Sequence, residues 1–173
     1  DPNHETTINN LLGNKDYGSL EYWESRFAVE DDYDWFTDYS DLQVHLRGLL
    51  PESMSPSSIR SLVIGCGTST LSADMYKDGF KEIHSVDYAS NAIQRMTQRY
   101  PLQDYPGLHF QVMDVTAMGG FQCSSFDFVV DKGTCDGMLT DGSTGEAKVA
   151  LVLKEVARVL RPQGVFALIS FRP

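Results

Sequence analysis

Hydrophobic and polar positions follow two alternating patterns along most of this chain. Short apolar runs, typical of buried strands, alternate with longer stretches in which apolar residues recur at helical spacing. The predicted strands span residues 62–64, 83–86, 108–113, 126–130 and 165–171. The predicted helices span residues 17–29, 40–49, 71–77, 90–99 and 145–160.

This order of elements predicts the fold class. Strands that are joined through helices by right-handed crossovers form a mostly parallel sheet with helices on both faces. We therefore predict an α/β fold, a Rossmann-like doubly wound sheet with the strand order 3-2-1-4-5, preceded by an N-terminal helical cap. A turn at residues 161–164 is expected to lead into the fifth strand. The inward face of the last helix is predicted to carry Val149, Val152, Leu153, Val156 and Leu160.

The length of 173 residues suits one hydrophobic core and is short for two ordinary domains. Residues 1–15 are polar and are expected to be flexible. Residues 16–173 are predicted to form a single domain, with the helical cap at 16–50 and a ligand-binding core at 59–173. A linker rich in Pro and Ser separates these two parts.

The residues suited to binding a ligand lie where the predicted strands end. Gly65 and Gly67 follow the first strand, Asp87 follows the second about twenty residues later, and Asp114 follows the third. A glycine turn and a carboxylate at the second strand tip are typical of folds that bind a nucleoside cofactor. A dinucleotide fingerprint requires a third glycine, but that position is Thr70. The pattern favours S-adenosyl-L-methionine as the ligand, because this cofactor has a ribose and an adenine but no pyrophosphate. The less favoured interpretation is a domain of the same fold that binds no ligand.

The composition of the chain limits the classes of partner that it is expected to bind. The formal net charge is −10, and Lys and Arg form no cluster, which disfavours nucleic acid. No apolar run approaches membrane-spanning length and the first residues are no signal peptide, so we expect a cytoplasmic protein without a membrane partner. The cysteines and histidines lack ligand spacing, and no metal site is expected. Acidic residues gather at positions 30–34, 38 and 41, either as a solvated face or as a rim that attracts a basic protein substrate.

Several motifs together resemble a known family. They are Tyr22-Trp23-x-x-Arg26-Phe27, Tyr33-Asp34-Trp35-Phe36, Ile64-Gly65-Cys66-Gly67, Ser85-Val86-Asp87-Tyr88, Met113-Asp114-Val115 and Asp131-Lys132-Gly133-Thr134-x-Asp136. The chain is similar to the class I S-adenosylmethionine-dependent methyltransferases of the methyltransferase-like group that modifies lysines on translation elongation factor 1-alpha. The resemblance implies methyl transfer to a protein lysine, with S-adenosyl-L-homocysteine as the product.

The resemblance also implies roles for individual residues. Those expected to bind the cofactor are Trp23, Phe27 and Trp35 at its methionine end, Gly65 and Gly67 in the turn beneath it, Asp87 at the ribose, Tyr88, Asp114 and Val115 around the adenine, and Lys132 in the pocket wall. Position 27 is usually tyrosine in relatives. Two further strands, the usual sixth and seventh, are absent from this sequence. If the chain ends at residue 173, the fifth strand is an exposed edge, and a homodimer through that edge is expected.

The catalytic assignment is less direct. Asp131 or Asp136 is expected to orient the lysine amine, with no dedicated general base, and Trp35 and Phe36 to contact the sulfonium or the lysine by cation–π attraction. The competing interpretations are that both aspartates cap a helix after the fourth strand, that Trp23 and Trp35 are core residues, and that Lys132 is an ordinary surface lysine. The alternative functions are methyl transfer to a small molecule or another side chain, and a non-catalytic cofactor-binding module.

Overall fold

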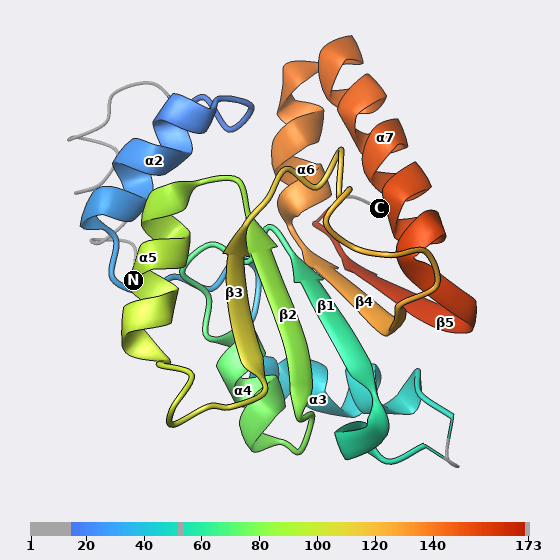
Figure 1. Ribbon diagram of the computed structural model, residues 1–173. Helices are drawn as coiled ribbons and strands as arrows, with labels where there is room; N and C mark the ends of the chain where they lie inside the picture. The colour runs from blue at the N-terminus through green and yellow to red at the C-terminus, as the bar shows by residue number, and fades with distance from the viewer. Residues whose placement is uncertain (1–14, 52–53, 172–173) are drawn as a thin grey trace.

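The computed structural model of the chain describes residues 15–51 and 54–171, so the flexibility predicted for residues 1–14 falls outside the described part. Strands and helices alternate along the chain as the sequence predicts (Figure 1). The strands are β1 (Arg60–Ile64), β2 (Glu82–Asp87), β3 (Leu108–Val112), β4 (Phe126–Lys132) and β5 (Leu160–Ile169). The helices are α2 (Leu20–Val29), α3 (Tyr39–Gly48), α4 (Leu71–Lys77), α5 (Ser90–Arg99), α6 (Thr134–Met138) and α7 (Ser143–Val159), with short 3-10 turns η1 (Pro56–Ser58) and η2 (Leu139–Asp141).

The sheet has the order β3-β2-β1-β4-β5 and all its neighbouring strands are parallel, which confirms the predicted topology. The chain reverses its direction of winding between β1 and β4, the two strands at the middle of the sheet. Ile64 lies beside Val86 on one side and beside Asp131 on the other. The carboxyl ends of the central strands are therefore level, and the residues that follow them meet at one edge, where ligands bind in folds of this class.

Helices cover both faces of the sheet. One face packs against α3, α4 and α5, and its core contains Val63, Met75 and Phe80, all buried. The other face packs against α6, α7 and the connection between β3 and β4, with Leu62 and Phe126 buried there. In Figure 1, α6 lies above the middle of the sheet, α7 runs from the top down to β5 at the right, and α5 lies to the left of β3. These two apolar layers, rather than polar contacts, hold the sheet and its helices together.

The two helices of the N-terminal cap attach to different parts of this core. Helix α3 packs against α4, and its Tyr39 and Leu46 belong to the main hydrophobic core. Helix α2 packs against α5 through a small cluster of Phe27, Ala89 and Ala92. The segment between them, residues 30–38, reaches the carboxyl end of β4 and carries the motif Tyr33-Asp34-Trp35-Phe36.

Three local predictions were wrong. Strand β4 continues through Lys132, so that Asp131 lies within the strand and not after it. Leu153 is 46% exposed, because the buried stripe of α7 runs through Val152, Val156 and Val159. The expected turn at residues 161–164 is an irregular part of β5, whose register with β4 shifts between Phe126 and Phe128. No helix among the described residues has the length and apolar character that a membrane crossing requires.

Candidate functional site

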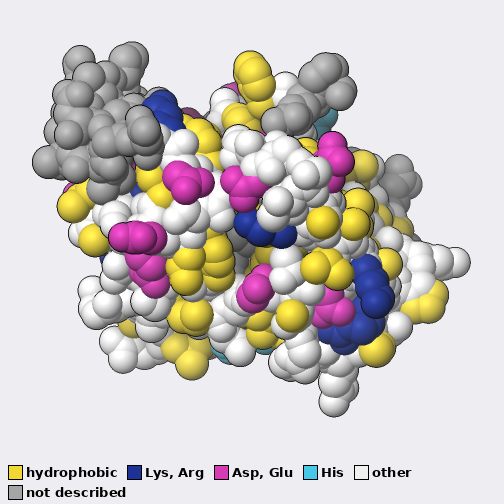
Figure 2. Space-filling view, turned by 90° about the horizontal axis from the view of Figure 1, so that it is seen from above, with side chains coloured by type: hydrophobic (Ala, Val, Ile, Leu, Met, Phe, Trp, Pro, Cys, Tyr) yellow, Lys and Arg dark blue, Asp and Glu magenta, His cyan; other side chains and the backbone are white. Residues whose placement is uncertain are grey.

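A cavity of about 440 Å³ opens at the carboxyl edge of the sheet, where the winding reverses. Its volume falls in the range typical of small-molecule sites. The lining includes all the residues that the sequence suggested for cofactor binding, namely Trp23, Phe27, Trp35, Gly65, Gly67, Asp87, Tyr88, Asp114, Val115 and Lys132. Seen from above, this end of the molecule shows hydrophobic side chains near the centre with separate acidic side chains among them (Figure 2).

The floor of the cavity is the glycine turn after β1. Gly65 and Gly67 have φ values of 59° and 48°, in the left-handed region that favours glycine. A Cβ atom on Gly65 would lie 2.0 Å from Oγ1 of Thr134, and one on Gly67 would lie 3.0 Å from the Phe27 ring. The turn therefore needs both glycines for its backbone conformation, and Gly65 also because Thr134 packs directly against it.

Asp87 lies at the tip of β2 and is buried. Its Oδ2 accepts a hydrogen bond from the Gly67 amide at 2.9 Å, and its Oδ1 accepts one from the Ala89 amide at 2.9 Å. Burial raises the pKa of Asp87 to about 6, although these amides oppose the shift. Each carboxylate oxygen has a second lone pair, so the group can still accept hydrogen bonds from a ligand in the cavity.

Asp34 does not line the cavity, but it is the principal supporting residue of the site that sequence reasoning missed. Its carboxylate lies at the N-terminus of α4, where it accepts hydrogen bonds from the Ser69 hydroxyl and from the Thr70 amide at 3.2 Å and hydroxyl at 3.1 Å. The Lys132 ammonium is 2.7 Å from Asp34 Oδ1 and also donates to the Trp35 carbonyl at 2.9 Å. Burial acts to raise the pKa of Asp34, but the Lys132 charge and these hydrogen bonds outweigh it and lower the pKa.

This arrangement decides what the glycine turn can bind. In dinucleotide folds, the helix that follows the turn directs its free amides and its positive dipole end at a pyrophosphate. Here the protein's own carboxylate, from Asp34, already occupies the N-terminus of α4. The Gly67 amide is likewise already donated, to Asp87. An incoming phosphate would meet a negative charge and few free donors, so the site suits a nucleoside that carries none.

A second buried ion pair supports the same segment from beneath. Arg26 and Glu30, one helical turn apart, are joined at 2.6 Å with side-chain exposures of 0% and 1%. Glu30 also accepts from the Thr68 hydroxyl at 2.9 Å, which ties the pair to the glycine turn. The Arg26 guanidinium lies 5.0 Å from the ring centres of both Tyr33 and Trp35. Arg26 therefore positions aromatic residues of the cavity wall without lining the cavity itself.

Aromatic rings form one wall of the cavity, in which Phe27 packs against the glycine turn. Trp23 stacks on Phe27 with ring centres 5.3 Å apart, and its indole donates to the Tyr17 carbonyl at 2.8 Å. Phe36 has a φ of 71°, an uncommon value for a bulky side chain. Its ring stacks on that of Phe171, which is 84% exposed, with centres 6.2 Å apart. Both rings line the cavity, and this exposed pair lies at its outer side.

The three remaining aspartates of the predicted site have different surroundings. Asp114 is exposed, and its Oδ1 accepts from the amide and the hydroxyl of Thr116 at 2.8 and 2.7 Å. Asp136 lines the cavity and accepts from the Ser170 hydroxyl at 2.9 Å. Asp131 does not line it. Asp131 is 0% exposed, and its two oxygens accept from the amides of Thr134 and Cys135 at 2.8 and 3.1 Å.

The geometry of Asp131 favours the alternative interpretation over the direct role expected of it. It caps the N-terminus of α6, the alternative interpretation from the sequence, and burial raises its pKa. The acidic rim is also smaller than predicted. Glu30 and Asp34 are turned inward into ion pairs, which leaves the exposed carboxylates of Asp31, Asp32, Asp38 and Asp41 on the surface. Lys132 is no surface lysine, because its side chain is only 4% exposed.

The known proteins that this chain resembles are methyltransferases, which agrees with the cofactor that the site suits. A family model described as a methyltransferase domain matches residues 56–172. The chain is 40% identical over 160 residues to EEF1A lysine methyltransferase 4 of Bos taurus, which covers 87% of this chain and 60% of that protein. It is 36% identical over 166 residues to the eEF1A lysine and N-terminal methyltransferase of Bos taurus, covering 93% of this chain and 23% of that protein. The chain thus spans less than two thirds of the length of these relatives.

Solved structures show the same fold at low sequence identity. The phosphoethanolamine N-methyltransferase 2 of Haemonchus contortus, in complex with phosphomonomethylethanolamine and S-adenosylhomocysteine, has a TM-score of 0.66 at 15% identity and covers 90% of this chain and 35% of that one. The YcgJ protein of Bacillus subtilis has a TM-score of 0.58 at 21% identity, covering 75% of this chain and 50% of that one. The described sheet and its flanking helices are therefore a widely used arrangement.

Proposed function

The chain belongs to the methyltransferase domain family, and on this premise we propose that it transfers the methyl group of S-adenosyl-L-methionine to a lysine side chain of a protein, elongation factor 1-alpha being the first candidate. The names of the relatives support this substrate. The observation that carries the proposal is the combination of two carboxylates, that of Asp34, which caps the N-terminus of α4 from outside the cavity, and that of Asp87, which lines the cavity. Together they favour a ribose without phosphate.

The residues present fit this cofactor. Asp87 would accept from the ribose hydroxyls, Tyr88, Asp114 and Val115 would surround the adenine, and the glycine turn would lie beneath the methionine end. Trp23, Phe27 and Trp35 would enclose the sulfonium side of the cofactor. When bound, S-adenosyl-L-methionine supplies an activated methyl group on a positively charged sulfur. Aromatic rings near such a charge contribute about 0.5–2 kcal/mol each, depending on exposure.

The protein's part in catalysis is then largely orientation and exclusion of water. A lysine nucleophile must be neutral, and its usual pKa of about 10.4 is lowered by burial among aromatic rings. We assign the entrance for this side chain to the stacked pair Phe36 and Phe171, because both rings line the cavity and both are exposed. The left-handed backbone of Phe36 holds its ring against Gly133, where a Cβ atom would lie only 3.0 Å away.

The two candidate catalytic aspartates take different roles in this proposal. Asp136 lines the cavity and is assigned the hydrogen bond that orients the incoming amine. Asp131 is assigned a positioning role, because it fixes the start of α6 and thereby the placement of Asp136 one turn later. The test is the pair of variants Asp136→Asn and Asp131→Asn. We expect the first to lower kcat with little change in cofactor affinity, and the second to lower thermal stability as well.

Partners and compartment follow from the same proposal. A substrate that belongs to the translation apparatus places the protein in the cytoplasm, and the exposed carboxylates of Asp31, Asp32, Asp38 and Asp41 favour a basic surface on it. Strand β5 is an edge strand of the described sheet. The homodimer expected through that edge is tested by light scattering, with a monomer as the result that contradicts it.

Incubation with tritiated S-adenosyl-L-methionine, purified elongation factor 1-alpha and total lysate tests the function. We expect label on a lysine of the elongation factor, located by mass spectrometry, and no label with the variant Asp87→Asn. Label only in the small-molecule fraction, or on another side chain, would replace the proposed substrate. Cofactor binding without any transfer would identify a non-catalytic binding module.

A further inference from the structure

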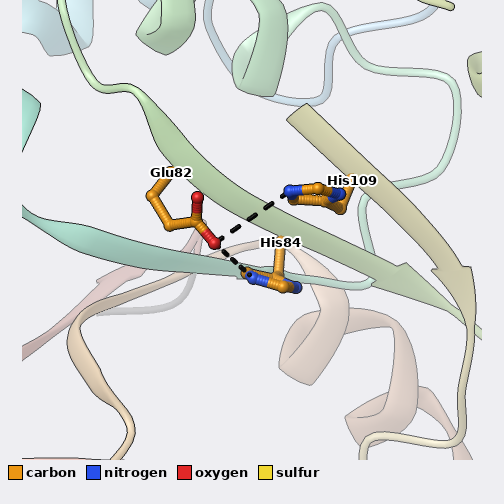
Figure 3. A group of neighbouring side chains, drawn as sticks. All are labelled: Glu82, His84 and His109. Carbon is orange, nitrogen blue, oxygen red and sulfur yellow. Dashed lines mark hydrogen bonds and ion pairs between the residues drawn. The ribbon is translucent and has the colours of Figure 1, made fainter. Parts of the chain in front are cut away.

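A cluster of two histidines and a glutamate lies at the opposite end of the sheet from the cavity. Glu82 Oε1 is 3.1 Å from Nε2 of His84 and 4.0 Å from Nε2 of His109 (Figure 3). One ligand atom from each of the three residues can be chosen so that all lie within 4.8 Å of one another. The side chains are 44%, 18% and 37% exposed respectively, so that an ion from solvent can reach them.

Strand geometry explains why residues far apart in sequence meet here. Glu82 and His84 are two positions apart on β2, so their side chains point to the same face of the sheet. His109 on β3 is the direct cross-strand partner of His84. The two imidazole rings stack with centres 4.8 Å apart and an interplanar angle of 25°. The sequence spacing hid this cluster, because His109 becomes a neighbour of Glu82 and His84 only when β2 and β3 pair.

The side chain of His84 is held in place by its surroundings. Its ring packs edge-on against Phe121 and Phe126, with centres 5.7 and 5.5 Å away.

Arg60 competes for the same atoms. Its guanidinium is 3.2 Å from Nε2 of His84 and 3.7 Å from Oε1 of Glu82. The Nε2 atom lies between a donor on Arg60 and an acceptor on Glu82, and it can serve only one of them in a given tautomer. The Arg60 side chain is 35% exposed, which leaves it a path into solvent.

We propose that Glu82, His84 and His109 form a binding site for a divalent transition metal ion of the zinc class, which displaces the Arg60 guanidinium and joins β2 to β3. Two imidazoles and one carboxylate are an established ligand set for zinc, with a fourth position left for water. Bonds of about 2.0–2.2 Å place tetrahedral ligand atoms about 3.4 Å apart. The observed separations of 3.1 and 4.0 Å from Glu82 Oε1 differ from this value by about 0.3 and 0.6 Å.

Titration with Zn²⁺ against a chromophoric chelator tests the proposal, using the full chain without an affinity tag and with Cys123→Ser as background. We expect one ion per chain and a rise in melting temperature when Zn²⁺ is added. Loss of a residue that only hydrogen-bonds to a zinc ligand typically weakens metal affinity by about 10–100-fold. Glu82→Gln and His109→Asn each remove a direct ligand, so each should weaken Zn²⁺ binding by at least about tenfold.

Two further variants make the test specific. His45→Asn removes an exposed histidine on α3 and should leave Zn²⁺ affinity unchanged. Arg60→Gln removes the competing charge and should strengthen binding by about tenfold or more, since a unit charge about 4 Å from a divalent ion is costly even in water. Circular dichroism verifies that each variant is folded. Zn²⁺ affinity that is the same in His109→Asn and the parent, or that does not rise in Arg60→Gln, would overturn the proposal.

Discussion

The sheet core and the segment from Trp23 to Phe36 are held in place by different forces. The core buries apolar side chains on both faces of β1, β2 and β4. The segment packs on α5 through a small apolar cluster, and two buried ion pairs, Arg26–Glu30 and Asp34–Lys132, join it to the glycine turn and the end of β4. It also contributes five of the aromatic residues in the cavity wall.

Because of this difference, a substitution can disturb the cavity wall without disturbing the sheet. Apolar packing tolerates a change of charge at a distant position, whereas a buried ion pair that loses one partner leaves a charge uncompensated in the interior. Charge substitutions should therefore loosen the aromatic wall and reduce ligand binding before they affect the sheet. The predictions below test this separation.

The largest effect is expected for Glu30→Gln. It leaves the Arg26 guanidinium, which is 0% exposed, without its counter-charge, at a cost of about 3–5 kcal/mol in the free energy of unfolding. Denaturant unfolding measures the loss. Lys77→Met is the matched control, because it breaks an ion pair in which Lys77 is 60% exposed and should cost less than about 1 kcal/mol. Equal losses in the two variants would contradict the account.

A somewhat smaller effect is expected for Lys132→Met. The substitution leaves Asp34 with hydrogen bonds but no counter-ion, and costs about 3 kcal/mol of stability, at the low end for a buried pair. The Trp35 carbonyl also loses its donor, so affinity for S-adenosylhomocysteine should fall by about tenfold, which corresponds to roughly 1.4 kcal/mol.

The double variant Asp34→Asn with Lys132→Met separates charge from packing. It removes both charges and should recover part of the lost stability, as a double-mutant cycle measures. Recovery should be smaller for ligand binding, because the Trp35 carbonyl still lacks its donor. A double variant no more stable than the worse single variant would show that the pair does not act through charge.

The pH dependence of binding follows from Asp87. Its folded pKa of about 6 lies above the usual 3.8, so the folded chain binds a proton at Asp87 between these values more readily than the unfolded chain does. The contribution of Asp87 to stability therefore decreases as the pH rises from about 4 to about 6. The pH dependence of ligand binding has the opposite sign. Ribose hydroxyls donate to the ionised carboxylate and favour that form, so ligand affinity increases as the pH rises.

We therefore expect the affinity for S-adenosylhomocysteine to fall as the pH drops below about 6, by at most about tenfold per pH unit. Calorimetry in buffers of different ionisation enthalpy should detect proton release on binding near that pH. The variant Asp87→Asn should bind more weakly and lose this pH dependence. A slope that persists in the variant would assign the titration to another group.

The smallest effect is expected at the exposed acidic residues. Neutralising Asp32 and Asp38 should lower kcat/KM for a basic protein substrate by about threefold at low salt, because exposed charges act mainly on the rate of encounter. The difference should vanish at high salt, where exposed charges are screened. Asp104→Asn, on the loop at the other end of the sheet, is the control and should have no effect. The same loss for Asp104→Asn would rule out a local role.

The sequence predicted those parts of the molecule that depend on local pattern. Apolar runs and helical spacing gave the strand order and most element bounds, and the residues at strand ends gave Gly65 and Asp87, because parallel strands finish at one edge. The motif aromatics Trp23, Phe27 and Trp35 came from the family resemblance, and they lie around the same cavity.

The remaining features depend on tertiary contacts that a linear pattern does not encode. Asp34 lies in a run of acidic residues that looks solvated, and only the distant Lys132 and the start of α4 turn it inward. Asp131 lies inside β4, one residue beyond the apolar run that marked the strand, so its capping of α6 was not preferred. Leu153 and Val152 are adjacent and equally apolar, and the packing of α7 selects Val152.

The central claim is that the Asp34 carboxylate at the start of α4 and the Asp87 carboxylate at the tip of β2 shape a site for a nucleoside without phosphate. Calorimetric titration of the chain with S-adenosylhomocysteine and, separately, with NADH tests it most directly. The account predicts saturable binding of one S-adenosylhomocysteine per chain and no measurable heat with NADH. Binding of NADH at comparable affinity, or of neither ligand, would contradict it.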